Sequence, residues 1–117
     1  YDFLRNNSYF TNILATDISL DGAMKGPSFH EYGEVLNSFP LINLIASGGV
    51  RDGLDIAKCI RLGAQMTALA QPFLAPALES SQAVIDRVQI LQEQLRWAMF
   101  LTGSKDLEAL KKAKLEE

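Results

Sequence analysis

The stretch Ser47-Gly48-Gly49-Val50-Arg51-Asp52-Gly53 is the most informative part of this 117-residue chain. The apolar run of residues 41–47 predicts a buried strand, and a helical pattern begins near Leu54, directly after the glycines. Glycine at the end of a strand lets backbone N–H groups approach a phosphate, and the following helix adds its positive N-terminal end. Two glycines are also typical of a simple tight turn. Taken alone, the stretch favours the simple turn over a phosphate site.

Strands and helices alternate along the rest of the chain. Apolar runs at residues 12–18 and 65–70 predict two more buried strands. A helical pattern follows each strand, over residues 29–37, from 54 to 62 and over 81–101, with a short helix over 106–114. These helices supply the long crossovers that parallel strands require. The sequence therefore predicts a single domain over residues 1–117 of the α/β class. We expect about three βα units with parallel strands, the arrangement of a partial (βα)8 (TIM) barrel.

Two signals mark the ends of the predicted helices. Ser28 and Glu31 have the spacing of a capping box at the start of the first helix. Gly63 stands where the C-terminal cap of the second helix is expected. We therefore expect a side-chain cap at Ser28 and a left-handed backbone at Gly63.

The end of the third predicted strand makes a phosphate site the favoured interpretation of the glycine stretch. The third predicted strand ends at Ala70 and Gln71 and leads into a short helical segment. Two adjacent parallel strands that end in this way build the phosphate site common after the seventh and eighth strands of (βα)8 barrels. We therefore predict a phosphate site between the two loops, with the candidate residues Gly48, Gly49, Arg51, Gly53, Ala70 and Gln71.

The end of the first predicted strand offers carboxylates on the same edge of the sheet. Asp17 is a candidate for proton transfer if its pKa is tuned, and a hydrogen bond to a backbone N–H is an equal alternative. Asp21 stands before Gly22, which favours a turn. No metal site is predicted, because His30 stands alone and metal sites need several ligands.

Composition indicates the cellular compartment of the chain and argues against two kinds of partner. The net charge is −3 and the pI is about 5.1, which argues against a nucleic-acid surface. The apolar runs are shorter than the roughly 18–20 residues of a membrane span. The first residues do not read as a signal peptide, and a single cysteine suits a reducing compartment. We expect a cytoplasmic chain that binds neither nucleic acid nor membrane.

The N-terminal part resembles one known family. Residues 13–29, ILATDISLDGAMKGPSF, and residues 45–50, IASGGV, resemble the sixth and seventh strands of the ProFAR isomerase of histidine biosynthesis. The pattern Thr-Asp-Ile, Asp-Gly, Gly-Pro is specific to that family. Under this resemblance, Thr16 is the nearest match to a supporting active-site residue, and Asp17 remains the other catalytic candidate.

The C-terminal part resembles a second family, type 2 isopentenyl-diphosphate isomerase, which is an FMN enzyme. The resemblance rests on residues 46–58, ASGGVRDGLDIAK, and on LGA at 62–64 and PFL at 72–74. The tail MFLTGSKDL at 99–107 is its most specific part. This resemblance implies that the predicted phosphate site holds the phosphate of FMN.

Together the two resemblances imply a chimera. Both families are (βα)8 barrels that hold a phosphate at this corner. The chain divides into a ProFAR-isomerase-like part, 1–46, and a part like the diphosphate isomerase, 47–117, with a seam within residues 46–50. This arrangement indicates a recombined or engineered chain. It corresponds to strands six to eight of a barrel, so most catalytic residues of both families lie on strands outside it.

The sequence leads to one function and two alternatives. We expect a phosphate-binding barrel fragment that binds FMN or a sugar phosphate weakly and is not catalytic alone. One alternative is an isomerase of either type, active only when the barrel is completed. The other is a structural module with no ligand. Three strands leave open edges and an uncovered face, so we expect self-association or a complementing barrel fragment, with Trp97 and Phe100 on a contact helix.

Overall fold

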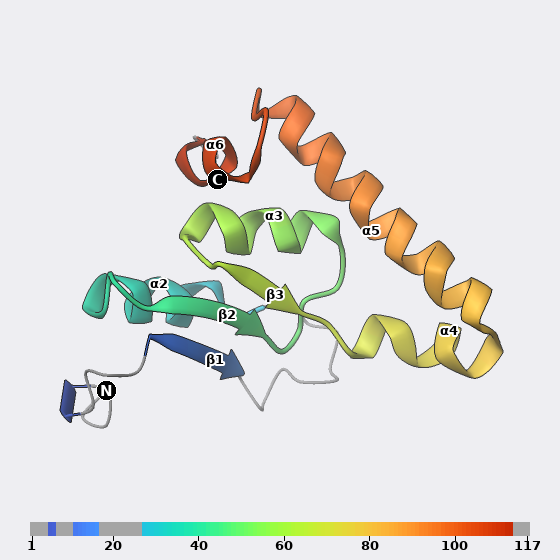
Figure 1. Ribbon diagram of the computed structural model, residues 1–117, viewed down its shortest axis with the longest axis horizontal. Coiled ribbons are helices and arrows are strands. Elements are labelled where there is room, and N and C mark those ends of the chain that lie inside the picture. The colour runs from blue at the N-terminus through green and yellow to red at the C-terminus, as the bar shows by residue number, and fades with distance from the viewer. Residues whose placement is uncertain (1–4, 7–10, 17–26, 114–117) are drawn as a thin grey trace.

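Three parallel strands form one sheet in this computed structural model, which describes residues 5–6, 11–16 and 27–113 (Figure 1). The strand order is β1-β2-β3, and both neighbouring pairs are parallel. The strands are β1 (Asn12–Thr16), β2 (Asn43–Ser47) and β3 (Met66–Ala68). This arrangement confirms the predicted α/β class with three parallel strands.

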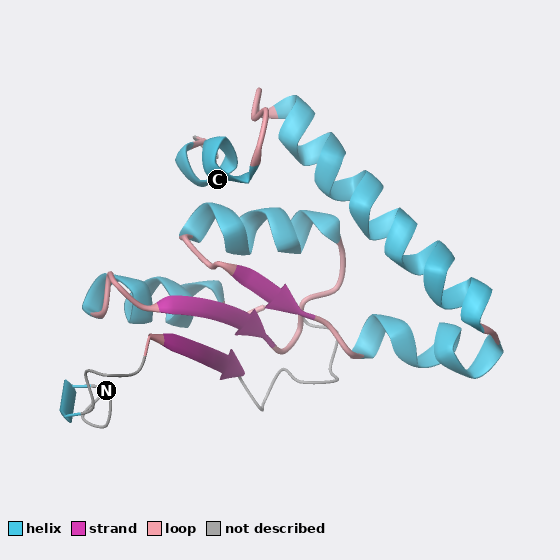
Figure 2. Ribbon diagram, viewed as in Figure 1, coloured by secondary structure: helices cyan, strands magenta, loops and turns pink. Residues whose placement is uncertain are grey.

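Helices follow each of the last two strands and precede β2, as Figure 2 shows. They match the predicted pattern to within a few residues, and the long helix has the predicted bounds. The strand before the glycines begins two residues later than expected, because the chain after Pro40 turns and Ile42 donates to the carbonyl of Phe39 at 3.1 Å. The helices are α2 (Phe29–Ser38), α3 (Gly53–Leu62), the 3-10 turn η1 (Gln71–Phe73), α4 (Leu74–Glu79), α5 (Ser81–Leu101) and α6 (Leu107–Lys112).

One face of the sheet is covered by α2 and α3. Leu44 and Ala46 of β2 are fully buried there against Tyr32 of α2 and Cys59 of α3. A second, outer cluster joins α3 to the last two helices, with Ile60 and Leu110 at its centre. The described part of the molecule is therefore layered as sheet, inner helices and outer helices.

The other face of the sheet is open in the described residues. Leu14, Ile45 and Met66 lie in one register row across the three strands. Leu14 is 60% exposed and Met66 is 56% exposed. The row is apolar, so it is the uncovered face that the strand count predicts. Association through this face stays a prediction.

The helix caps differ in part from the sequence prediction. Within the described residues, Ser28 makes no side-chain capping bond to α2, because its backbone is neither extended nor helical, at φ −82° and ψ 66°. The predicted capping box is therefore wrong. Gly63 is left-handed and caps α3, as predicted. Asp52, Ser80 and Asp106, by contrast, are side-chain caps of α3, α5 and α6 that the sequence analysis did not name.

The long helix α5 exposes its aromatic residues. Trp97 and Phe100 are 54% and 75% exposed, and their rings meet edge to face with centroids 6.0 Å apart. Neither residue belongs to the core clusters of the described residues. That they form a contact surface stays a prediction. None of the described helices is both long enough and apolar enough to cross a membrane.

Candidate phosphate-binding site

A small pocket lies between the loops that follow β2 and β3. Its volume is about 110 Å³, and its described lining consists of residues 47–50 from the first loop and 68–71 from the second. The two strands are parallel and Ser47 pairs with Ala68, so both loops leave the sheet at the same edge. The two loops therefore line one shared pocket, as the sequence predicts.

The first loop depends on two consecutive glycines. Gly48 and Gly49 both have positive φ, at 86° and 76°. In a residue with a side chain, this left-handed backbone would cost about 1–2 kcal/mol of stability. Within the described residues, the N–H groups of these glycines donate to no other group. Such a loop presents backbone donors to an anion without a side chain in the way.

The chemistry of the lining suits a phosphate group. The described lining contains neither a carboxylate nor a cationic side chain, and its polar side chains are those of Ser47 and Gln71. Backbone N–H groups, one hydroxyl and one amide are groups that donate hydrogen bonds to phosphate oxygens. The residues present therefore fit the phosphate of a cofactor or a substrate.

The second loop contributes Ala70 and Gln71 to the lining. Ala70 accepts a hydrogen bond from the N–H of Phe73 at 3.0 Å, which forms the short turn η1. Pro72 within that turn is buried. The turn fixes the position of Gln71 at the mouth of β3, so both predicted residues of this loop lie at the pocket.

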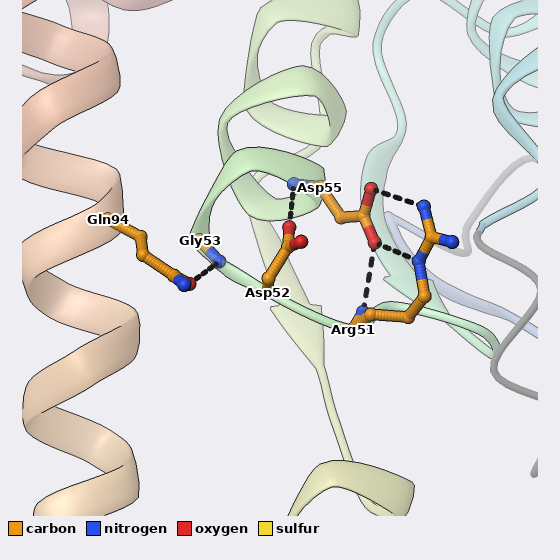
Figure 3. A network of polar contacts seen from close by, with 5 residues as sticks. All are labelled: Arg51, Asp52, Gly53, Asp55 and Gln94. Carbon is orange, nitrogen blue, oxygen red and sulfur yellow. Dashed lines mark hydrogen bonds and ion pairs between the residues drawn. The ribbon is translucent and has the colours of Figure 1, made fainter.

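Arg51 is a predicted site residue that lies next to the pocket, directly after the lining residue Val50. Its guanidinium pairs with Asp55, with Nε 2.9 Å from Oδ2 and Nη2 3.4 Å from Oδ1 (Figure 3). It is not part of the pocket lining. The hydrogen bond and the charge of Asp55 raise the pKa of Arg51 above its ordinary value. Arg51 is therefore paired with Asp55 next to the loop, and its contact with a phosphate stays a prediction.

Gly53 is also outside the pocket lining. Its N–H donates to Oε1 of Gln94 on α5 at 2.7 Å. A Cβ at this position would lie 2.4 Å from Cβ of Gln94 and 2.6 Å from the carbonyl oxygen of Leu91. Position 53 requires glycine because α3 and α5 approach closely there, so this residue packs two helices together.

The catalytic candidates lie at the end of β1 or beyond the described chain. Thr16 is exposed and pairs in register with Ser47, so it adjoins the pocket. Asp17 lies outside the described residues.

Three residues near the site were missed by the sequence analysis. Asp55 holds Arg51, and Tyr32 of α2 donates from Oη to the carbonyl of Ser47. Gln94 reaches the loop from α5. The spacing of Arg51 and Asp55, four residues apart beside a helix start, was a usable signal. Nothing in the sequence indicates which face of α2 or α5 meets the loop.

Relatives of the chain are isopentenyl-diphosphate delta-isomerases. That of Mycobacterium marinum is 39% identical over 98 residues, covering 77% of this chain and 28% of the relative. That of Cronobacter sakazakii is 43% identical over 89 residues, covering 76% and 26%. That of Halobacterium salinarum is 57% identical over 67 residues, covering 57% and 19%. The chain thus spans about a quarter of the length of its curated relatives.

Solved structures of similar fold include mandelate oxidases. One, a variant with the monooxide FMN adduct, has a TM-score of 0.81 at 24% identity, covering 98% of this chain and 38% of that chain. Another, with benzoyl-formic acid, has a TM-score of 0.69 at 26% identity, covering 77% and 28%. The first likeness is one of fold alone. It identifies the three βα units as part of a TIM barrel.

The family follows from these comparisons. The relatives confirm the resemblance of the C-terminal part to isopentenyl-diphosphate isomerase. The comparisons give no support for a ProFAR-isomerase-like part or for a seam, which both stay predictions. The model of the FMN-dependent dehydrogenase family matches residues 28–117. The chain belongs to the FMN-dependent dehydrogenase family.

Proposed function

We propose that the chain is the phosphate-binding part of a TIM barrel and binds the phosphate group of FMN weakly, without catalysis on its own. The observation that carries this proposal is the pocket shared by the ends of β2 and β3, lined by Gly48 and Gly49 with positive φ. Membership of the FMN-dependent dehydrogenase family favours FMN as the ligand. Most of the barrel that would surround the flavin lies outside this chain.

Backbone and side-chain groups of the pocket would together hold the phosphate of FMN. The N–H groups of the glycine loop meet the phosphate oxygens, and Ser47 and Gln71 add side-chain donors. Bound FMN supplies the redox-active flavin ring. Weak affinity is expected, because the described lining has no cation to balance the phosphate charge.

Titration of the chain with FMN, inorganic phosphate and ribose 5-phosphate tests the proposal. We expect FMN and phosphate to bind, and Gly49→Val to abolish binding because valine cannot adopt the left-handed loop. Gly103→Val is the matched control. Gly103 also has positive φ, at 67°, and no atom lies within 4 Å of its added Cβ. Absence of binding by the unaltered chain, or equal binding by Gly49→Val, would refute the proposal.

The ribose 5-phosphate arm addresses the N-terminal resemblance. A ProFAR-isomerase-like part implies a sugar phosphate as the ligand in place of FMN. Tighter binding of ribose 5-phosphate than of FMN would support that resemblance and a chimeric origin. A folded chain that binds none of the three compounds would leave the structural module as the function.

A second candidate function is isomerase activity in a completed barrel. The apolar row Leu14, Ile45 and Met66 lies open, and the chain spans about a quarter of its relatives. A closed (βα)8 barrel needs about five more strands, which would extend the sheet beyond β1 and beyond β3. The expected partner is therefore a complementing fragment with those strands.

Co-expression with such a fragment of a relative tests this second function. We expect isopentenyl-diphosphate isomerisation in the presence of FMN, and loss of it in Met66→Asp, which places a charge on the open face that the completed barrel would cover. Leu41→Asp is the control, because Leu41 is 93% exposed and lies outside the strands. ProFAR isomerisation is assayed in parallel. No activity of either kind refutes this function, and a doubled solution mass of the chain alone indicates self-association.

A further inference from the structure

A buried carboxylate lies directly behind the glycine loop. Asp55 is 4% exposed, and both of its oxygens contact Arg51. The guanidinium donates to both oxygens, and the backbone N–H of Arg51 donates to Oδ2 at 3.0 Å. Figure 3 shows the carboxylate facing Arg51 with three dashed contacts. Asp55 therefore holds the main chain of Arg51 as well as its side chain.

Two further hydrogen bonds hold the segment that follows Arg51, one to Asp52 and one to Gln94. Oδ1 of Asp52 accepts from the N–H of Asp55 at 2.8 Å, which anchors the carboxylate's own residue at the start of α3. Gln94 of α5 accepts from the N–H of Gly53. The chain that leaves the pocket at Val50 therefore enters a segment held at three successive points (Figure 3).

We propose that Asp55 is a positioning residue for phosphate binding, which holds Arg51 so that the preceding glycine loop is shaped before the ligand arrives. This inference rests on the proposed function. Arg51 is then an internal partner of Asp55, and the phosphate charge is met by backbone N–H groups. Affinity gained in this way comes from a loop that does not need to be ordered on binding.

The energetics favour this role over simple stabilisation. A buried carboxylate loses its hydration and is tolerated only when it is fully hydrogen-bonded. An apolar residue at this position would fill space without that requirement. The carboxylate gives the loop something that an apolar side chain cannot give, namely an acceptor for the backbone N–H of Arg51.

The test compares the affinity for FMN and inorganic phosphate with thermal stability. In Asp55→Asn, we expect the Kd for both to rise about tenfold, equivalent to ~1.4 kcal/mol. Asp106→Asn is the charge-matched control, since Asp106 caps α6 and lies outside the pocket lining. Leu110→Ala is the stability control, since Leu110 is buried between α3 and α6. Leu110→Ala should lower the Tm and leave the Kd unchanged.

Arg51→Gln separates positioning from direct contact and also serves if Asp55→Asn does not fold. It removes the guanidinium contacts and keeps the backbone contact, so we expect a rise in Kd smaller than tenfold and an unchanged salt dependence of the Kd. A larger loss than in Asp55→Asn, with a flatter salt dependence, would make Arg51 the ligand's counter-charge and overturn the inference. Unchanged affinity in the folded variants would also overturn it.

The proposed function and this inference fail in different ways. If the unaltered chain binds neither FMN nor phosphate, the proposed function is refuted and the inference falls with it. If the unaltered chain binds and folded Asp55→Asn binds equally well, only the inference is refuted.

Discussion

Tyr32 of α2 donates a hydrogen bond from its phenol oxygen to the backbone carbonyl of Ser47, the last residue of β2. Tyr32 is 2% exposed, so its hydroxyl needs a partner inside the protein. Ser47 is also the first residue of the pocket lining. The helix that precedes β2 is thereby joined to the point where the phosphate loop begins.

Tyr32→Phe should lower the free energy of unfolding by about 1 kcal/mol, because the half-buried Ser47 carbonyl loses a donor while the ring stays in place. Urea unfolding followed by circular dichroism measures the change. Tyr32→Leu adds the loss of aromatic packing and should cost more. An unaltered midpoint in Tyr32→Phe would contradict a stabilising role for the hydroxyl.

The same substitution should have opposite effects at two glycines. Gly49→Ala should destabilise the fold by about 1–2 kcal/mol, because φ at Gly49 is 76°. Gly33→Ala should stabilise it by up to about 1 kcal/mol, since Gly33 lies within α2 with no atom within 4 Å of an added Cβ. Thermal unfolding of both variants gives the comparison. Equal shifts of the same sign would show that the loop does not need a left-handed residue.

Cys59 should be inert to thiol reagents in the folded chain. Burial, with a smaller contribution from the charge of Asp55, raises the pKa of its thiol from 9.0 to about 12. The reactive thiolate is therefore nearly absent at pH 8. Mass spectrometry after iodoacetamide treatment should show no adduct in buffer and one adduct in urea. Rapid labelling of the native chain would contradict the buried position.

The same thiol makes stability depend on alkaline pH. Its folded pKa lies above its unfolded value, so its contribution is fully present below pH 9.0 and is lost as the pH rises toward about 12. Unfolding of the parent chain and of Cys59→Ala, measured from pH 7 to 11, isolates this effect from other groups. The stability difference between the two should change only above about pH 9. A constant difference would indicate that Cys59 does not titrate on unfolding.

Two leucines three positions apart should differ widely in their effect. Leu44 is fully buried in β2, and Leu41 is 93% exposed. Leu44→Ala should cost about 2–5 kcal/mol through loss of burial and a residual cavity. Leu41→Ala should change stability by less than about 0.5 kcal/mol. Denaturant midpoints measure both, and similar losses would contradict the assignment of the core to the helix-covered face.

Local patterns made most of the fold predictable from sequence. The bounds of α5 follow from its apolar periodicity, and they agree with the structure. The glycine pair and the end of β3 led to a shared pocket because parallel strands end at one edge. The capping box at Ser28 failed because local spacing does not determine the backbone angles of the cap residue.

Long-range packing is what the sequence could not predict. Gly53 looks like part of a phosphate loop, yet its neighbours are Gln94 and Leu91 of α5, about forty positions later in the chain. Arg51 looks like a phosphate ligand because its charge and place suit that role. The buried carboxylate of Asp55 pairs with it instead, and here the four-residue spacing was a local signal that the sequence did contain.

The close contact at Gly53 sets the spacing between two layers of the molecule. Because the backbone of Leu91 and Leu95 lies within 2.7 Å of the site where a methyl group would stand, the axis of α5 cannot move nearer, and any larger residue pushes it away. In a library randomised at position 53, selection for folded molecules would recover glycine almost alone. The missing side chain of Gly53 thus determines how closely the 21-residue helix α5 packs against the loop.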